Sequence, residues 1–202
     1  MTVKRGPKTH LHTHHHAVQF YGNDESLFTT VGGFLSEGLV TGHPAIIIAT
    51  RAHNESIARE LTSRMIDVDA AASAGELHFL DADEMLATFM RGDVPNPGKF
   101  RHHVGGLVTQ ALGDRPASIV RAYGEMVDVL WKQGREDAAI RLEILWNQLA
   151  QSHGFALLCG YSMGNFYKQA ERFQEVCHQH THLMHTDENV VIFDKEKHAK
   201  TA

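Results

Sequence analysis

Apolar runs alternate along this chain with amphipathic segments, in an order that predicts strands separated by helices. The clearest strand lies at residues 44–50, where PAIIIAT is apolar and rich in β-branched side chains, as in a parallel strand covered on both faces. The pattern predicts four further strands, at residues 17–21, 76–80, 117–122 and 155–159. It predicts seven helices, at residues 24 to between 38 and 42, 54–65, 81–90, 100–112, 124–131, 135–152 and 166–178. Alternation at this spacing predicts an α/β fold, a three-layer sandwich with a mostly parallel, doubly wound sheet between helices.

This architecture also predicts where a ligand would bind, because ligands of such sheets bind beyond the carboxyl ends of the strands. Tyr21 ends the first predicted strand, and Tyr123 and Glu125 follow the fourth. Glu143 and Asn147 are four residues apart on the next long helix and therefore share one face. These five residues are the predicted ligand-binding set. The alternative is that Glu125 caps a helix while Glu143 makes surface or core hydrogen bonds.

The distribution of polar residues predicts three parts of the chain. Residues 1–15 are polar, rich in histidine and without periodicity, which predicts a flexible arm. Residues 16–183 carry the periodic pattern and form one predicted domain. Residues 184–202 are a predicted tail with a short extended piece at 190–193. A chain of 202 residues with 43% hydrophobic and 21% charged residues is long enough to bury one sizeable core.

The charge of the chain argues against a nucleic-acid partner. The formal net charge is −5, and the basic residues gather only in a short group, Lys4, Arg5 and Lys8. Binding to nucleic acid depends on many contacts between phosphates and Lys or Arg, which this surface would not provide.

Apolar runs and cysteines indicate the compartment. The longest apolar stretch, residues 44–49, is too short to cross a membrane, and residues 1–16 lack the apolar core of a secretory signal. We therefore expect a cytoplasmic protein without membrane contact. The chain has only two cysteines, which suits a reducing compartment, and Cys159 lies in an apolar strand where a thiol is usually a small core residue.

The familiar enzyme motifs are absent from the sequence. It contains no GxxxxGK[ST], GxSxG, HExxH or GxGxxG motif. After the first strand, Asp24 and Glu25 stand where a triphosphate would require backbone amides and a lysine. The sequence thus predicts a binding protein without a reaction of its own, and a degenerate nucleotide-binding protein is one alternative.

The 16 histidines are the compositional exception, and they suggest a second alternative, a metal-binding or metal-sensing protein. One group occupies residues 10–16. The other, His178, His180 and His182 behind Cys177, is the predicted metal-binding set, with a divalent transition metal as the candidate cofactor. Neither group has the fixed spacing of a zinc finger, and mobile histidine-rich tracts often bind metal only loosely.

The order of several short motifs resembles the MEDS domain, a sensory domain of methanogens and methylotrophs. The resemblance extends over residues 16–183 and rests on these segments: 16–21 (HAVQFY), 34–39 (FLSEGL) with Gly42, 45–50 (AIIIAT), 123–125 (YGE), Glu143 with 146–147 (WN), 158–161 (LCGY), and 176–177 (VC) with His180. It implies a fold similar to the RecA and KaiC ATPases in which the phosphate loop has been lost. It also implies the sensing of small, often one-carbon or hydrocarbon-derived compounds.

Domains of this family are usually joined to a histidine kinase or a DNA-binding output. The sequence after Phe173 is too short for a further domain, so the expectation is a stand-alone sensory module. Such a module would bind a small molecule and signal to a separate histidine kinase or transcriptional regulator. A second copy, in a homodimer, is a further candidate partner.

Overall fold

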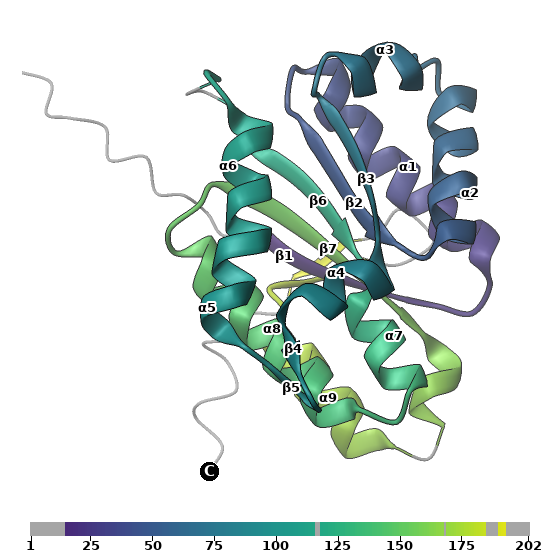
Figure 1. Cartoon of the computed structure of the whole chain (residues 1–202). Helices are drawn as coiled ribbons and strands as arrows, with labels where there is room; N and C mark the ends of the chain where they lie inside the picture. The colour runs from purple at the N-terminus through teal and green to yellow at the C-terminus, as the bar shows by residue number, and fades with distance from the viewer. Residues whose placement is uncertain (1–14, 116–117, 168, 185–189, 193–202) are drawn as a thin grey trace, which may run out of the picture.

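The described residues form a seven-stranded sheet in the strand order β3-β2-β6-β7-β1-β8-β9. Figure 1 labels its first five strands, from β3 to β1. The computed structural model describes residues 15–115, 118–167, 169–184 and 190–192. Six strands are parallel, and β9 is antiparallel to β8 at the edge. The strands are β1 (His15–Tyr21), β2 (Ala45–Ala49), β3 (Leu77–Asp81), β6 (Val120–Gly124), β7 (Phe155–Ser162), β8 (His182–Met184) and β9 (Val190–Ile192). The separate hairpin consists of β4 (Met90–Arg91) and β5 (Val94–Pro95).

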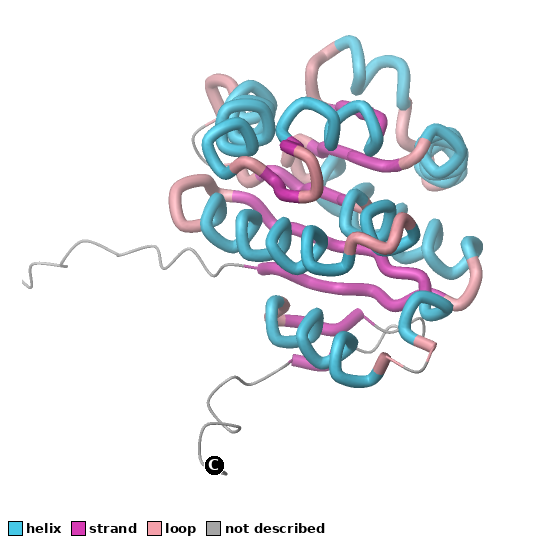
Figure 2. Tube along the Cα trace, turned by 60° about the horizontal axis from the view of Figure 1, so that its bottom comes forward, coloured by secondary structure: helices cyan, strands magenta, loops and turns pink. Residues whose placement is uncertain are grey.

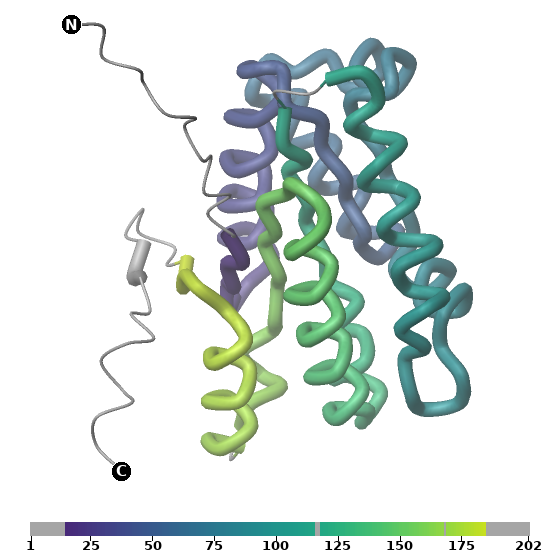
Figure 3. The backbone as a smooth tube through the Cα atoms, turned by 90° about the vertical axis from the view of Figure 1, so that its left-hand side faces the viewer, coloured from purple at the N-terminus to yellow at the C-terminus, as the bar shows by residue number. Residues whose placement is uncertain are grey.

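Helices cover both faces of the sheet, which confirms the predicted α/β sandwich (Figure 2). One face is covered by α1 (Asp24–Val40), α2 (Arg51–Ser63) and α3 (Val68–Ser73). The other is covered by α4 (Ala82–Phe89), α5 (Pro97–Phe100), a π-helical turn (Arg101–Gly105), α6 (Gly106–Leu112), α7 (Met126–Lys132), α8 (Glu136–Ala150) and α9 (Ala170–Gln179). A 3₁₀ turn (Met163–Phe166) connects β7 to the last of these, which packs beside α8 (Figure 3).

Two hydrophobic cores form because neighbouring side chains of a strand point to opposite faces. In β2, Ile46 and Ile48 belong to the core under α4–α9, whereas Ile47 belongs to the core under α1 and α2. All five residues of β2 are buried, as the uninterrupted AIIIA run predicts for a central parallel strand. The same alternation directs Ala17 of β1 to the core under α1 and α2, whereas the adjacent His16 points to the other face of the sheet.

A side-chain hydrogen bond sets the start of α1, and two other predicted boundaries differ from those observed. α1 begins at Asp24, but its cap is the preceding residue, Asn23, whose side chain accepts from the backbone N–H of Ser26 over 2.9 Å. Asp24 instead lies in the first turn. The strand predicted at 117–122 is observed at Val120–Gly124, and the helix predicted at 166–178 begins at Ala170.

Most residues at the two ends of the chain lie outside the described part of the structure. The predicted arm lies outside the described residues except for His15, which begins β1. Within the predicted tail, Met184 ends β8, and Val190–Ile192 forms β9 against it. No helix among the described residues has the length and apolar character needed to cross a membrane.

Candidate functional site

Glu125 is the centre of a polar cluster at the carboxyl edge of the sheet. It directly follows β6 and is 1% exposed. Its Oε1 accepts from the backbone N–H of Thr50 over 2.6 Å, and its Oε2 lies 2.7 Å from His53 Nδ1 and accepts from the Tyr123 hydroxyl over 3.0 Å. Its side chain does not cap α7, contrary to the capping alternative. The carboxylate instead connects the ends of β2 and β6 to α2.

Asp128, in the first turn of α7, is the second hub of this edge and is 2% exposed. Its Oδ1 accepts from the backbone N–H of Ser162 over 2.8 Å and from Asn165 Nδ2 over 2.6 Å. Its Oδ2 accepts from the Tyr21 hydroxyl over 3.2 Å and pairs with Lys132 Nζ at 2.8 Å. Asp128 therefore binds the ends of β1 and β7 to α7.

These contacts shift the pKa values of the titratable side chains at the carboxyl edge. The hydrogen bond to Glu125 raises the pKa of His53, against the opposing effect of burial. Burial, together with the nearby carboxylates of Asp128 and Glu125, raises the pKa of Tyr21. Burial and Glu125 likewise raise the pKa of Tyr123. Both phenols therefore remain protonated donors at neutral pH.

A second polar cluster is fully enclosed beneath α8 and α9, away from the carboxyl edge of the sheet. It consists of His16, Glu143, Cys159 and His180, each 0% exposed. One atom from each of these side chains lies within 4.8 Å of the others. Each comes from a different element or its end: β1, α8, β7 and the residue after α9. We call these four residues the buried cluster.

The contacts within the buried cluster are short. His16 Nε2 lies 3.2 Å from Glu143 Oε2 and 3.4 Å from Cys159 Sγ. The Cys159 thiol donates to Glu143 Oε2 over 3.5 Å, and His180 Nε2 lies 3.4 Å from Glu143 Oε1. Tyr161 donates its hydroxyl hydrogen to Glu143 Oε1 over 2.9 Å. Both oxygens of the Glu143 carboxylate therefore have polar contacts within the protein.

Charge and burial compete in this cluster. Burial raises the pKa of Glu143, but His180 and His16 together outweigh burial and lower it, so this carboxyl group is ionised. Burial and the neighbouring His180 lower the pKa of His16, although Glu143 and Asn147 act in the opposite direction. Burial and the Glu143 charge raise the pKa of the Cys159 thiol. A buried anion of this kind requires a cationic partner.

The five predicted ligand-binding residues fall into two groups. Tyr21, Tyr123 and Glu125 lie at the carboxyl edge, where their polar atoms pair with other groups of the chain. Glu143 belongs to the buried cluster beneath α8 and α9, and Asn147 contacts that cluster through His16. The prediction that residues 143 and 147 share a face is consistent with their contacts to one histidine.

Of the four predicted metal-binding residues, the structure brings only His180 into the buried cluster. His178 is exposed, and Cys177 and His182 are partly buried. The sequence prediction placed His16 at the start of the domain, grouped it with the N-terminal histidines, and took Cys159 as a core residue. It did not name His53, Asp128 or Tyr161 as site residues. The strand register pairs Val18, two residues after His16, with Cys159, and that register has no signal in the sequence.

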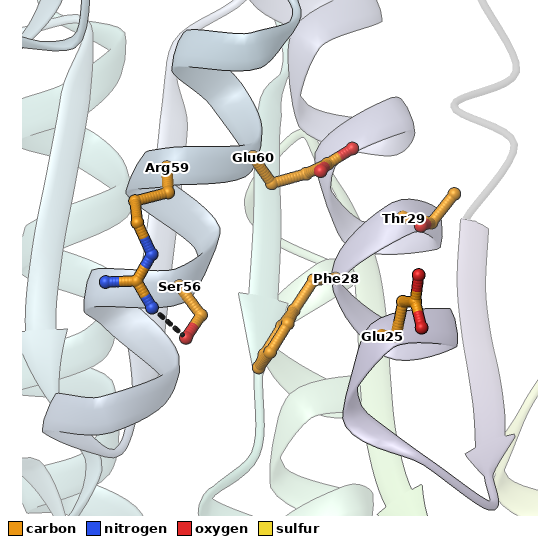
Figure 4. Close-up of a pocket in the computed structure, with 6 residues that line it drawn as sticks. All are labelled: Glu25, Phe28, Thr29, Ser56, Arg59 and Glu60. Carbon is orange, nitrogen blue, oxygen red and sulfur yellow. Dashed lines mark hydrogen bonds between the residues drawn. The ribbon is translucent and has the colours of Figure 1, made fainter.

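Two cavities are prominent among the described residues, and none of the five predicted ligand-binding residues lines either. The smaller, about 400 Å³, lies between α1 and α2 (Figure 4). Its residues are Glu25, Phe28 and Thr29 of α1 and Ser56, Arg59 and Glu60 of α2. The larger, about 650 Å³, lies between α1 and the early parts of β1, β6 and β7, with β8 beside them.

The larger cavity combines apolar and polar walls. Ala17 and Leu158 of the sheet and Phe34 of α1 provide apolar surface. Arg121 and Glu37 provide charge: their side chains pair at 3.4 Å, and the guanidinium lies 5.0 Å from the centre of the Phe34 ring. This arrangement could hold a small molecule with an apolar body and one polar group.

Comparison with known proteins gives a family and a fold. No curated protein matches the chain. Among solved structures, an uncharacterized protein from Pyrococcus horikoshii, crystallised in complex with an unknown peptide, is similar, with a TM-score of 0.61 over 91% of this chain and 85% of that chain. At 12% identity, this likeness concerns the fold alone. The family model described as the methanogen/methylotroph, DcmR sensory domain matches residues 15–181. The chain therefore belongs to the MEDS family of sensory domains.

Proposed function

We propose that this chain is a sensory domain that binds a small, partly apolar molecule in the 650 Å³ cavity between α1 and the sheet. The observation that carries the proposal is the cavity itself, because its volume falls within the range of about 300–1,000 Å³ typical of small-molecule sites. It lies between α1 and an apolar part of the sheet. A ligand acts on such a module through its different affinity for two conformations.

Arg121 suggests the chemistry of the ligand. Its Nε is a buried donor without a hydrogen-bond partner among the described residues, while its side chain is 19% exposed beside the cavity. A buried donor without a partner costs free energy, which an acceptor on the ligand would recover. The proposed ligand therefore has a short apolar body and one acceptor or anionic group.

The polar residues of the carboxyl edge have a different place in this proposal. Tyr21, Tyr123 and Glu125 already have hydrogen-bond partners within the chain. We therefore assign these three residues a structural role, in which they connect the ends of the strands to the helices. A partner protein, such as a histidine kinase or a transcriptional regulator, would read the shift of α1 that ligand binding produces.

We also propose, from the family resemblance, that the fold derives from RecA- or KaiC-like ATPases and has lost nucleotide binding. Asn23 already occupies the Ser26 N–H at the start of α1, and Asp24 and Glu25 place negative charge in its first turn. An anion at a helix start depends on free N–H groups and positive potential, so a triphosphate would be repelled here. ATP with Mg²⁺ should neither bind nor be hydrolysed, and turnover above a matched Glu125→Ala variant would contradict this part of the proposal.

The cavity can be tested by filling it. Gly33 lines it from α1, and a methyl group at this position would make only ordinary contacts, the nearest at 3.5 Å from Arg64. The probes are short carboxylates such as butanoate and the matched alcohols, with binding followed by ligand-observed NMR. We expect binding to the wild type and to Gly33→Ala, loss of binding in Gly33→Leu, and loss of the preference for carboxylates in Arg121→Gln.

Each variant must retain the circular dichroism spectrum and cooperative unfolding of the wild type. Undiminished butanoate binding to a folded Gly33→Leu variant would place the ligand elsewhere. Absence of binding by every probe to the wild type would reject the proposed ligand class.

A further inference from the structure

We propose that the buried cluster of His16, Glu143, Cys159 and His180 is a binding site for one divalent transition metal ion, with Zn²⁺ the best match. Two imidazole nitrogens, one carboxylate and one thiolate are all ligands that Zn²⁺ uses in proteins. The site differs from the predicted set behind Cys177 and shares only His180 with it. It also does not depend on the proposed ligand cavity, which lies on the other face of β1.

The spacing of the four side chains fits tetrahedral coordination. With metal–ligand bonds of about 2.0–2.3 Å, the ligand atoms of a tetrahedral zinc site lie about 3.3–3.8 Å apart. The distances from His16 Nε2 to Glu143 Oε2 and to Cys159 Sγ are 3.2 and 3.4 Å. The distance from Cys159 Sγ to Glu143 Oε2 is 3.5 Å, and that from His180 Nε2 to Glu143 Oε1 is 3.4 Å. Three edges of one tetrahedron, those that join His16 Nε2, Cys159 Sγ and Glu143 Oε2, are therefore close to their metal-bound lengths, and His180 Nε2 lies beside the other oxygen of the same carboxylate.

The hydrogen bonds around the cluster orient both imidazoles as metal ligands. His180 Nδ1 lies 2.7 Å from the Val176 carbonyl oxygen, so Nδ1 carries the hydrogen and donates it. His16 Nδ1 lies 3.0 Å from Asn147 Oδ1, and the orientation of that amide is fixed because its Nδ2 donates to the Gln179 carbonyl. A metal-binding histidine typically donates its other ring N–H to an oxygen acceptor in this way. In the neutral form, each histidine then turns the lone pair of Nε2 toward the cluster.

The environment of His180 Nε2 also supports a metal ion in the buried cluster. It is buried, and it has no hydrogen-bond partner among the described residues, although it lies 3.4 Å from Glu143 Oε1. A neutral imidazole would face the carboxylate there lone pair to lone pair. Either a proton or a metal ion must lie between them, and a metal ion would satisfy His180, His16 and Cys159 at once.

The charges also balance around a divalent ion. Glu143 and a Cys159 thiolate together contribute two negative charges, so the loaded site is neutral, which suits a position with 0% exposure. On binding, the Cys159 S–H bond is broken, its proton leaves to solvent together with the proton of any imidazolium paired with Glu143, and the freed sulfur and nitrogen electron pairs form bonds to the metal. The alternative without metal is a protonated histidine paired with Glu143, with the thiol retained.

The position of the site indicates what the metal would do. Four protein ligands leave no open coordination position, as in structural rather than catalytic zinc sites. The ligands join α8, β1 and β7 to the residue between α9 and β8. β8 pairs with β1 over only three residues, so the metal would fix α9 and β8 onto the sheet.

Co²⁺ provides the sharpest test, because a tetrahedral Co²⁺–thiolate site shows intense visible bands and a sulfur-to-cobalt charge-transfer band. The full chain, purified without an added affinity tag and freed of metal with EDTA, is titrated with Co²⁺ and then with Zn²⁺. Any Co²⁺ held by the histidines at residues 10–14 would have no sulfur ligand, so the charge-transfer band reports cysteine ligation alone. The chain has only two cysteines, which makes Cys177→Ala the matched control for Cys159→Ala.

We expect the charge-transfer band to saturate at one equivalent in the wild type and in Cys177→Ala, and to be absent in Cys159→Ala. Zn²⁺ should displace Co²⁺ and raise the Tm by roughly 5–10 °C at a hundredfold excess over the dissociation constant. Asn147→Leu, which removes the acceptor for His16 Nδ1, should weaken metal affinity about 10- to 100-fold while retaining the band.

Two results would overturn the proposal. One is the absence of a charge-transfer band in folded wild-type protein, which does not depend on whether any variant folds. The other is a band that survives in Cys159→Ala and disappears in Cys177→Ala, which would assign the metal to the segment behind Cys177. Neither result bears on butanoate binding, so this site and the proposed cavity fail independently.

Discussion

His53 Nδ1 lies 2.7 Å from Glu125 Oε2 and thereby joins α2 to the residue that follows β6. The hydrogen bond with Glu125 raises the pKa of His53 above 6.5, its value in the unfolded chain. Asp24, 3.8 Å from Nε2, acts in the same direction, whereas burial and Lys132 act against it. A raised pKa means that the pair stabilises the fold fully below pH 6.5 and that this contribution is lost as pH rises through the folded-state pKa.

His53→Gln should therefore lower the free energy of unfolding by about 1.5 kcal/mol at acidic pH, the value for a hydrogen bond to a charged group, and by less at alkaline pH. Urea unfolding at about pH 5.5 and about pH 8.5, on either side of the histidine range, measures the difference. His102→Gln, at an exposed position, serves as the control and should change little at either pH. A difference between wild type and His53→Gln that grows with pH would contradict the assigned direction.

Asp128→Ala should be the most destabilising change at the carboxyl edge. It leaves the Ser162 N–H, the Asn165 amide and the Tyr21 hydroxyl without their acceptor, in a place where Asp128 is 2% exposed. Removing one partner from a buried charged network costs roughly 3–5 kcal/mol, which urea unfolding can measure. Lys132→Ala is the matched control, because Lys132 is 54% exposed and its ion pair should contribute less than about 1 kcal/mol. Equal losses in the two variants would show that Asp128 acts only through the ion pair.

The pattern of apolar residues was sufficient to predict the sandwich, because strands such as β2 are buried on both faces and have no polar positions. It failed for β8, whose three residues are partly buried and whose pairing with β1 is a long-range contact. It also failed for α3, a short helix whose residues are all at least partly exposed.

The buried cluster shows why site residues are harder to predict than strands. Glu143 and Asn147 were found because four residues make one helical turn, which is a local rule. His16 and Cys159 are 143 residues apart, and their contact follows from the register of β1 against β7. A one-residue change of that register would move His16 to the other face, and no local pattern in either strand specifies it.

Met65→Gly should stabilise the protein. Met65 has a φ of 65° and is 91% exposed, and it follows Arg64, the residue that caps the C-terminus of α2. The N–H of Ile66 donates to Leu61 and that of Met65 to Thr62, which is the Schellman arrangement that usually has glycine at this position. Relief of left-handed backbone strain, about 1–2 kcal/mol, exceeds the entropy cost of glycine, about 0.5–1 kcal/mol. Thermal unfolding should show a small rise in Tm, and Met65→Ala, which retains the strain, should show none.

Gly160→Ala should destabilise the protein because Gly160 of β7 leaves room for the Tyr123 ring. An added methyl group would lie 2.7 Å from the Tyr123 hydroxyl oxygen and 3.4 Å from Leu27 Cδ1. Overpacking of a core typically costs about 1–3 kcal/mol, and moving the hydroxyl also weakens its 3.0 Å hydrogen bond to Glu125. Gly106→Ala is the matched control: its position in α6 is exposed, nothing lies within 4 Å of the added methyl, and alanine should stabilise the helix by about 0.5–1 kcal/mol.

The cause can be isolated with a double mutant. Tyr123→Phe removes the oxygen that the new methyl group would meet, at the cost of the hydrogen bond to Glu125. If the clash with the hydroxyl dominates, Gly160→Ala combined with Tyr123→Phe should lose less free energy of unfolding than the sum of the two single losses, by at least about 0.5 kcal/mol. Strictly additive losses would mean that the methyl group is resisted by the ring and by Leu27 rather than by the hydroxyl that holds Glu125.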